Sequence, residues 1–305
     1  MEDGSTTGGR APSHGKLYAL IVVMVFLWSA NFIVAKYALR EFPPLLAGGL
    51  RVALAGFFML PVYAWQSQRT AKHPHRRDIP ILFLLGLLGI ALNQMLFMVG
   101  LSQTSVGHSA IVVAVNPMII FLMAAWMGLE RLTTRKLAGL VIAIVGVAVL
   151  QWKPAAHTGS GAAPSLAGDL LILASGLSFA AFTVYGKRVT LRHSSITVNT
   201  FGYVGAALAM APVTWWLSRE FSYSAVTPTA WLAVVYMALF PSVICYMIFY
   251  YALQHVNASR VAAFTYMQPI IAITLAAILL GERVSASLVA GGVIIFSGVY
   301  LAERT

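Results

Sequence analysis

The fold is decided by a stretch of sequence that occurs twice. Residues 116–150 read NPMIIFLMAAWMGLERLTTRKLAGLVIAIVGVAVL, and residues 268–302 read QPIIAITLAAILLGERVSASLVAGGVIIFSGVYLA. A shift of 152 positions aligns the two stretches without a gap. The matched residues are Pro117 and Pro269, Glu130 and Glu282, Arg131 and Arg283, Gly139 and Gly291, and Gly146 and Gly298. A proline, an acid-base pair and two glycines in register indicate an internal duplication.

The composition is typical of a membrane protein. Hydrophobic residues make up 59% of the 305 residues and charged residues only 10%, whereas a soluble domain has roughly 25% charged residues. Most apolar runs are 18 to 25 residues long, which is the length that an α-helix needs to cross a hydrocarbon core of about 30 Å. Because the runs are continuous, they exclude the short alternating segments of a transmembrane β-barrel.

Ten apolar runs predict an all-α membrane protein with ten transmembrane helices, five in each half. The runs cover residues 17–39, 44–65, 79–102, 105–128, 134–152, 166–189, 196–217, 228–253, 258–280 and 286–302. The first run is too long for a signal-peptide core, so we expect it to remain as an anchor. The predicted domains are a tail at 1–16, a first repeat at 17–152, a linker at 153–165, a second repeat at 166–302 and a tail at 303–305.

The distribution of Lys and Arg predicts the orientation, because cationic loops resist translocation. With both termini in the cytoplasm, fourteen of the 20 Lys and Arg residues lie on the inner side and five on the outer side, and Arg51 alone lies inside a span. This topology explains the net charge of +11 better than a nucleic-acid partner does. Five helices per repeat also predict that the second repeat is inverted relative to the first, an arrangement that many alternating-access transporters use.

Several residues carry a resemblance to a known family. The first predicted helix contains the stretch Leu27–Phe32 (LWSANF), and the second contains Arg51. Together with the twice-written Pro, Glu-Arg, Gly, Gly pattern, they resemble the EamA group of the drug/metabolite transporter superfamily from Leu17 to Ala302. The resemblance implies a multi-pass exporter of amino acids or related metabolites in the bacterial inner membrane, with a central cavity between the repeats. It also implies that the fifth and tenth helices pack away from that cavity.

Polar and aromatic side chains in the middle of several spans are the candidate substrate-binding residues. Many share a helical face at a spacing of three or four residues, and they recur in corresponding helices of the two halves. The candidates are Trp28, Asn31, Phe32, Arg51, Asn93, Phe97, Phe182, Tyr185, Tyr246, Tyr250 and Gln268. For each residue alone the alternative is a core or helix-helix contact, whereas their clustering favours a binding site.

Two side-chain amides that each precede a proline are the candidate hinges. Asn116-Pro117 and Gln268-Pro269 occupy matched positions of the repeats. Each proline lacks the N–H that would continue the helix, and the amide beside it can bond the freed backbone. Interrupted helices at matched positions point to a transporter's binding site.

The carboxylates predict how transport is energised. All nine lie in tails, loops or the first turns of spans, whereas proton-driven transporters keep an ionisable group at membrane depth. We therefore expect movement that needs no imposed gradient. Arg51 offers a fork to a substrate carboxylate, with an arginine that snorkels to the outer headgroups as the alternative. His108 is interpreted as an interface histidine rather than a proton relay.

No catalytic, metal or cofactor site is predicted. Gly15-Lys16 and Gly186-Lys187 lack the spacing of a phosphate loop, and His73 and His75 have no third metal ligand nearby. The expected partners are the lipid bilayer and a small amphipathic or zwitterionic molecule, and a homodimer is left open. The alternatives are a permease or importer of another metabolite, such as a nucleobase or sugar-nucleotide, and a membrane-embedded enzyme.

Overall fold

The computed structural model describes residues 14–70, 74–128, 133–150, 163–190, 192–255 and 264–303. Every regular element within these ranges is a helix, so the all-α prediction is confirmed for them. Most of the predicted tail at 1–16 and of the linker at 153–165 lies outside the described residues, as do Glu130 and Arg131 of the repeated motif.

The first half of the chain forms eight helical segments. They are α1 (His14–Leu39), α2 (Pro44–Thr70), α3 (Ile79–Gly86), η1 (Leu87–Leu92), α4 (Asn93–Gln103), α5 (Val106–Val113), α6 (Asn116–Trp126) and α7 (Thr134–Leu150). The first helix thus begins three positions before the predicted start at Leu17, and the second continues beyond its predicted end at Trp65.

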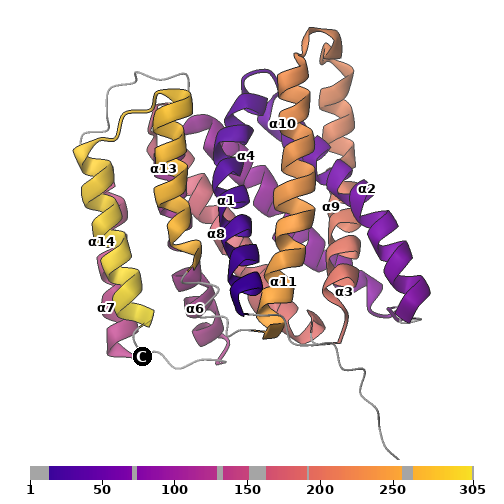
Figure 1. The fold of residues 1–305 in the computed structure, drawn as a ribbon, viewed down its shortest axis with the longest axis horizontal. Coiled ribbons are helices and arrows are strands. Elements are labelled where there is room, and N and C mark those ends of the chain that lie inside the picture. Colours follow the sequence, from indigo (N-terminus) through magenta and orange to yellow (C-terminus); the bar gives the residue numbers. More distant parts are fainter. Residues whose placement is uncertain are drawn as a thin grey trace, which may run out of the picture.

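The second half of the chain forms a corresponding series. It consists of α8 (Leu166–Thr190), α9 (Ser195–Arg219), the short η2 (Tyr223–Ala225), α10 (Pro228–Leu239), η3 (Phe240–Ile244), α11 (Cys245–His255), α13 (Met267–Leu280) and α14 (Ala286–Glu303). All these segments stand side by side in one bundle (Figure 1).

The helices are long and apolar enough for a multi-pass membrane protein. Seven candidate spans cover Gly15–Leu39, Pro44–Arg69, Ile79–Gln103, Val106–Trp126, Leu166–Tyr185, Ser195–Arg219 and Pro228–Phe249. Shorter apolar helices cover Met267–Leu280 and Ala286–Ala302. Large apolar side chains such as Phe57, Leu208 and Ile278 are more than half exposed on the bundle surface, which suits contact with lipid. The count of ten membrane-spanning helices stays a prediction.

Corresponding helices of the two halves pack against each other in opposite directions. A Cβ added to Gly139 of α7 would lie 2.4 Å from the carbonyl oxygen of Gly298 in α14, and one on Gly146 would lie 2.9 Å from that of Gly291. The glycines therefore let the two backbones approach closely, as expected for helix contacts in lipid. Figure 1 shows α7 and α14 together at one edge of the bundle.

The pair α2 and α9 repeats this antiparallel arrangement. Gly49 lies against the side chain of Thr214, and Gly56 lies against the backbone of Tyr203. As the residue number rises along α2, its partner's number on α9 falls, so matching helices of the two halves run in opposite directions. This geometry supports the inverted relationship of the repeats.

Both halves interrupt the same two helices. η1 is a π-helical segment within the third predicted span, and its bounds shifted by the 152-residue repeat are 239–244, which contain η3 at 240–244. The fourth predicted span breaks at a turn over residues 114–115, and the ninth has a turn at Tyr266, which is residue 114 shifted by 152. The turn at 114–115 lies immediately before Asn116-Pro117, and the turn at Tyr266 lies one residue before Gln268-Pro269.

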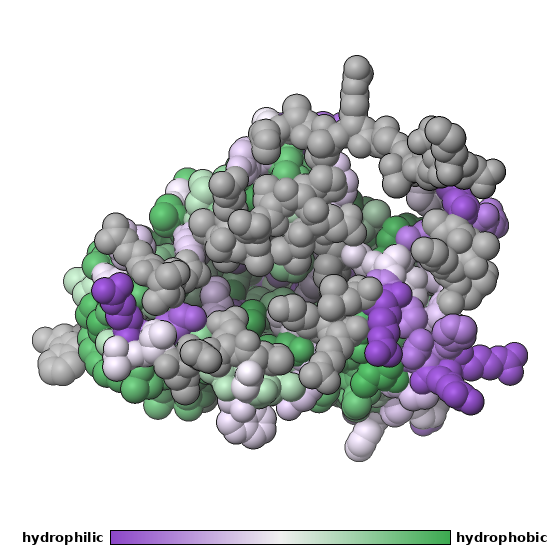
Figure 2. All heavy atoms as spheres, turned by 90° about the horizontal axis from the view of Figure 1, so that it is seen from below, coloured by the Kyte–Doolittle hydropathy of each residue, from purple (hydrophilic) through white to green (hydrophobic). Residues whose placement is uncertain are grey.

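The two ends of the bundle are named after the predicted orientation. The outer end holds residues 40–43, 104–105, 220–227 and 281–285, and the inner end holds residues 74–78 and 192–194. Ser105 and Thr227 cap helices at the outer end, and Ser194 caps one at the inner end; the three hydroxyls accept hydrogen bonds from backbone N–H groups. Figure 2 shows hydrophilic side chains gathered mainly at one side of the inner end.

Candidate substrate site

The candidate site is centred on Arg51, which lies on α2 and is 3% exposed. Its Nε donates a hydrogen bond to Ser242 Oγ in the second repeat, at 3.1 Å. Its Nη1 is buried and has no hydrogen-bond partner among the described residues, and no described carboxylate forms an ion pair with it. The snorkelling interpretation is wrong, because the side chain turns into the protein rather than toward the membrane surface.

The partner of Arg51 lies in the π-helical segment η3. Ser242 Oγ donates to the carbonyl of Met237 at 2.9 Å while it accepts from Arg51. Pro241 has no N–H to continue the helix, and its own carbonyl accepts from Nε1 of Trp28 at 3.2 Å. The segment therefore joins α1 and α2, and π-helical segments are frequent at functional sites.

An aromatic chain runs beside the guanidinium. The rings of Trp28 and Tyr246 meet edge to face with centroids 5.9 Å apart, and Tyr246 meets Tyr203 at 6.4 Å. Both tyrosines are near enough to Arg51 to interact with it electrostatically. Aromatic faces attract cations as well as apolar groups, so the surroundings of Arg51 suit a molecule with a carboxylate and an ammonium or apolar part.

Three buried amide groups on other helices also have atoms without partners. Oδ1 of Asn31, Oε1 of Gln94 and Nδ2 of Asn199 make no hydrogen bond with the described residues. The three side chains lie on α1, α4 and α9, and each is less than 9% exposed. Unpaired buried polar atoms are rare in folded proteins, so these atoms are candidates for contact with a bound molecule.

Four other predicted residues make contacts between helices. Phe32 packs against Phe97 with ring centroids 5.5 Å apart, which joins α1 to α4. Asn93 Nδ2 donates to the carbonyl of Ser175 at 2.8 Å, which is the helix-helix contact that was the alternative for this residue. Phe182 instead fills the space over Gly89 and packs with Leu82, Leu85 and Val198.

Tyr185, Tyr250 and Gln268 are not brought to Arg51 by any described contact. Tyr185 is 45% exposed, which places its ring on the outside of the bundle. The side chain of Tyr250 lies outside the described residues. Gln268 is partly buried in the first turn of α13. The spacing of aromatic and polar residues in the sequence did not distinguish these three residues from the candidates that lie near Arg51.

The predicted hinge residues begin the two interrupted helices. Pro117 lies in the first turn of α6, and Pro269 lies in the first turn of α13, where it is buried. Asn116 lies against α8, where a Cβ on Gly176 would meet its Oδ1 at 2.2 Å. The interruptions are thus observed at the predicted positions, and their role in bending stays a prediction.

Four residues of the site were missed by the sequence patterns: Ser242, Tyr203, Gln94 and Asn199. Ser242 could have been found through Pro241, which occupies the position of Gly89 in the first repeat and disturbs its helix. Gln94 lies next to the predicted Asn93, whereas Asn199 has no predicted site residue close to it in the sequence. No spacing distinguishes a buried amide from a lipid-facing one.

The described residues contain no group of three or more His, Cys, Asp or Glu side chains that could hold a metal ion. The single cysteine, Cys245, is buried, and its Sγ lies 3.6 Å from the carbonyl oxygen of Met24.

The sequence is similar to those of known transporters. The sequence model of the EamA-like transporter family matches residues 15–152 and 166–303. The uncharacterized inner membrane transporter YedA of Escherichia coli is 29% identical over 298 residues, covering 94% of this chain and 90% of that protein. The uncharacterized transporter YyaM of Bacillus subtilis is 25% identical over 290 residues, covering 95% of this chain and 94% of that protein.

A solved crystal structure has the same fold. It is 19% identical, superposes with a TM-score of 0.65, and the match covers 95% of this chain and 97% of that chain. Since the family match covers both halves of the sequence, the chain belongs to the EamA-like transporter family of the drug/metabolite transporter superfamily.

Proposed function

We propose that the protein transports small organic molecules that carry a carboxylate, and that it exports amino acids or related metabolites across the bacterial inner membrane. The observation that carries this proposal is the buried guanidinium of Arg51, which has a neutral hydroxyl as its described hydrogen-bond partner. A buried charge is costly unless it is paired. A carboxylate offers two oxygens in the geometry that the guanidinium fork binds.

The surroundings of Arg51 favour an amphipathic or zwitterionic molecule. Tyr246 interacts electrostatically with the guanidinium and meets the ring of Trp28. Asn31 supplies a buried acceptor without a described partner. An ammonium group fits the aromatic faces and the acceptor, while the carboxylate fits Arg51. An amino acid combines the two groups.

The position of the site supports alternating access. Arg51 belongs to the first repeat and Ser242 to the second, so rocking one repeat against the other changes the surroundings of the bound molecule. The interrupted helices before Asn116 and Gln268 give matched places at which the repeats can bend. In the conformation described here the guanidinium is closed off from both ends.

The experiment compares Arg51→Ala with wild type in proteoliposomes that contain an amino acid or its uncharged amide. We expect the variant to slow movement of the carboxylate about a hundredfold and that of the amide much less, since a charge-assisted hydrogen-bond pair is worth about 3 kcal/mol. Arg69→Ala is the matched control, because Arg69 lies on the same helix but is exposed on the ring of Trp65. Equal slowing of both substrates would contradict the role of Arg51.

The same vesicles test the energy source. We expect substrate to equilibrate without an imposed pH difference, because the described residues place no carboxylate beside Arg51. Accumulation above equilibrium that requires a proton gradient would contradict facilitated movement.

The orientation has its own test. Single cysteines in a Cys245→Ser background replace Ser222 at the outer end or Ser194 at the inner end, both of which are exposed. In intact cells, an impermeant thiol reagent should label the cysteine at position 222 and leave the one at 194 unlabelled. The reverse labelling pattern would show that the protein has the opposite orientation in the membrane.

The second candidate function is a permease or importer of a sugar-nucleotide or nucleobase. The observation in its favour is that a guanidinium binds phosphate as readily as carboxylate, and Tyr246, which interacts electrostatically with Arg51, offers a ring on which a base could stack. Counterflow of a labelled nucleotide that is abolished by Arg51→Ala, with no counterflow of amino acids, would favour this alternative. Chemical change of the substrate during transport would instead indicate an enzyme.

A further inference from the structure

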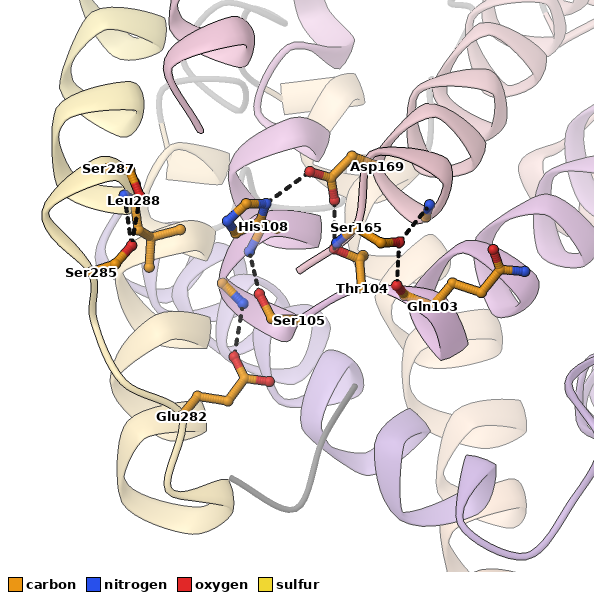
Figure 3. Close-up of polar contacts among 12 residues, drawn as sticks. Gln103, Thr104, Ser105, His108, Ser165, Asp169, Glu282, Ser285, Ser287 and Leu288 are labelled. Atoms are coloured by element: carbon orange, nitrogen blue, oxygen red, sulfur yellow. Dashed lines mark hydrogen bonds and ion pairs between the residues drawn. The ribbon is translucent and has the colours of Figure 1, made fainter. Parts of the chain in front are cut away.

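A buried, hydrogen-bonded pair of ionisable side chains joins the two repeats at the outer end, away from the Arg51 site. Nδ1 of His108 on α5 lies 2.8 Å from Oδ2 of Asp169 in the first turn of α8, and each side chain is 2% exposed. The other carboxylate oxygen accepts from Thr104 Oγ1 at 2.6 Å. Figure 3 shows the His108 ring directed at Asp169.

The arrangement of this pair leaves one nitrogen able to take up a proton. A carboxylate accepts hydrogen bonds, so Nδ1 of His108 carries the hydrogen and neutral His108 has its lone pair on Nε2. Nε2 is buried and has no hydrogen-bond partner among the described residues. Histidine is the side chain that ordinarily changes charge between about pH 5 and pH 8.

Two further charged side chains, Lys36 and Glu282, lie at the same end of the bundle as His108 and Asp169. Nζ of Lys36 on α1 donates to the carbonyls of Leu101 and Thr104, at 2.5 and 2.6 Å. The carboxylate of Glu282, before α14, accepts from the backbone N–H groups of Val106 and Gly107, at 2.9 and 3.2 Å. Lys36 and Glu282 also interact electrostatically. We name Lys36, His108, Asp169 and Glu282 the outer charge cluster.

The elements packed on α5 contribute few other titratable groups. α5 contacts α1, α4, α8, α13 and α14. α4 and α13 contain no titratable side chain, and the Tyr300 and Glu303 of α14 lie toward the inner end. The other charged or titratable groups at the outer ends of α1 and α14 are Tyr37, whose hydroxyl donates to Leu279 O, and the exposed Arg40 and Arg283, which flank these helices.

The outer charge cluster is complementary across the repeats. Both basic members, Lys36 and His108, belong to the first repeat, and both acidic members, Asp169 and Glu282, belong to the second. With neutral His108 the cluster has one positive and two negative charges. One proton on Nε2 makes two of each sign, so it strengthens the attraction that holds the repeats together at this end. The attraction between adjacent charges is stronger in a buried site than in water, and it opposes the cost of burying the added charge.

We propose that His108 and Asp169 form a proton-binding site, and that a proton taken from the outer solution holds the outer end closed. This inference rests on the proposed alternating access. Because the site lies at one end of the bundle, the proton is taken up and released on the same side and is not carried across. External acid therefore slows transport without changing the final distribution of substrate.

The test measures opening of the outer end in purified protein without substrate. A Ser109→Cys reporter, in a Cys245→Ser background, occupies a buried position next to His108. At each pH, the rate of its reaction with a soluble maleimide is divided by the rate for the same reporter in a protein that also carries His108→Gln. We expect this ratio to fall about tenfold between about pH 8 and pH 5.5, since a change of one buried charge interaction shifts an equilibrium by this order. The division cancels the pH dependence of the thiol itself.

Two further variants make the test decisive. His193→Gln is the matched control, because His193 pairs with Asp78 at the inner end, and it should leave the pH dependence unchanged. Asp169→Asn should raise labelling at all pH values and remove the pH dependence, which provides a second readout if His108→Gln does not fold. A pH dependence that survives in both His108→Gln and Asp169→Asn, or faster labelling in acid, would overturn the proposal.

The outcome is independent of the substrate proposal. Labelling is measured without any cargo, so a failure of Arg51→Ala to discriminate carboxylates leaves the proton site standing. Conversely, if labelling does not depend on pH but Arg51 still distinguishes carboxylates from uncharged substrates, the proton site alone is overturned.

Discussion

The two ends of the bundle join the repeats with the same chemical groups but in different surroundings. At the outer end, His108 and Asp169 are each 2% exposed and lie 2.8 Å apart. At the inner end, His193 and Asp78 are 11% and 28% exposed and lie 3.1 Å apart. The inner pair borders a cavity of about 700 Å³ that is also lined by His75, Arg76, Arg77 and Arg192.

The difference in burial decides what each pair can do. Water and salt screen the inner pair, and exposed ion pairs contribute at most about 1 kcal/mol. The outer pair is shielded from solvent, so a change in its charge is felt at close to full strength. The excess of basic residues at the inner end is what the predicted topology leads us to expect. The outer charge cluster instead sets basic residues of the first repeat against acidic residues of the second.

The largest effect is expected from removing one acid at each end. Asp169→Asn should lower the free energy of unfolding by about 3 kcal/mol, because it leaves part of a buried pair uncompensated. Asp78→Asn should lower it by less than about 1 kcal/mol. Thermal unfolding of the two variants in the same detergent checks the prediction. Equal shifts in Tm would show that the two ends do not differ energetically.

The next effect compares two cations at the outer end alone. Lys36→Met should cost about 2 kcal/mol, because it leaves the carbonyls of Leu101 and Thr104 unpaired and removes the positive charge beside Glu282. Arg40→Met, one turn farther along, should cost less than about 0.5 kcal/mol, since Arg40 is exposed and stacks on Tyr37. A Tm loss for Arg40→Met as large as for Lys36→Met would contradict the importance of burial.

The prolines test whether the two ends move together. Pro117→Ala and Pro269→Ala allow the interrupted helices to continue, so we expect substrate movement and cysteine accessibility at both ends to slow by about threefold, as hinge substitutions do. Pro44→Ala is the control, because Pro44 begins α2 and leaves no hydrogen bond missing. Slowing at one end only would mean that each hinge serves its own end.

The sequence could predict much of the fold because membrane helices leave a strong local signal. Apolar run length and the register of the duplication predicted the helices and the breaks before Pro117 and Pro269. These features depend on neighbouring residues or on matching positions 152 apart, both of which can be read directly from the chain. The paired glycines did not by themselves predict that α7 packs on α14.

The sites were harder to predict because they depend on contacts between distant residues. Arg51 was identified from its type, but Ser242 is 191 positions away and is placed by a π-helical segment. Asp169 was assigned to the end of a span from its position, and its burial against His108 depends on how α5 packs on α8. Tyr185 matched the same aromatic pattern as Tyr246 but faces outward, since an all-apolar helix does not mark its lipid face.

The smallest expected effect concerns an exposed contact that also joins the repeats at the outer end. The hydroxyl and N–H of Thr227 both donate to the carboxylate of Glu41, at 2.6 Å each. These hydrogen bonds, the one from the side chain first, lower the pKa of Glu41 below its ordinary value of 4.5. The contact therefore adds stability above about pH 4.5 and loses it as the pH falls through the lower, folded-state pKa.

Glu41→Gln keeps the shape of this contact but does not titrate. The Tm of wild type should exceed that of the variant slightly at about pH 6, and the difference should disappear as the pH falls through the lowered pKa of Glu41. All other carboxylates are shared by the two proteins, so the difference reports Glu41 alone. A difference that grows in acid would reverse the sign derived from the lowered pKa. A difference as large as that of Asp169→Asn would show that burial is not what separates the strong contacts of the outer end from the weak ones.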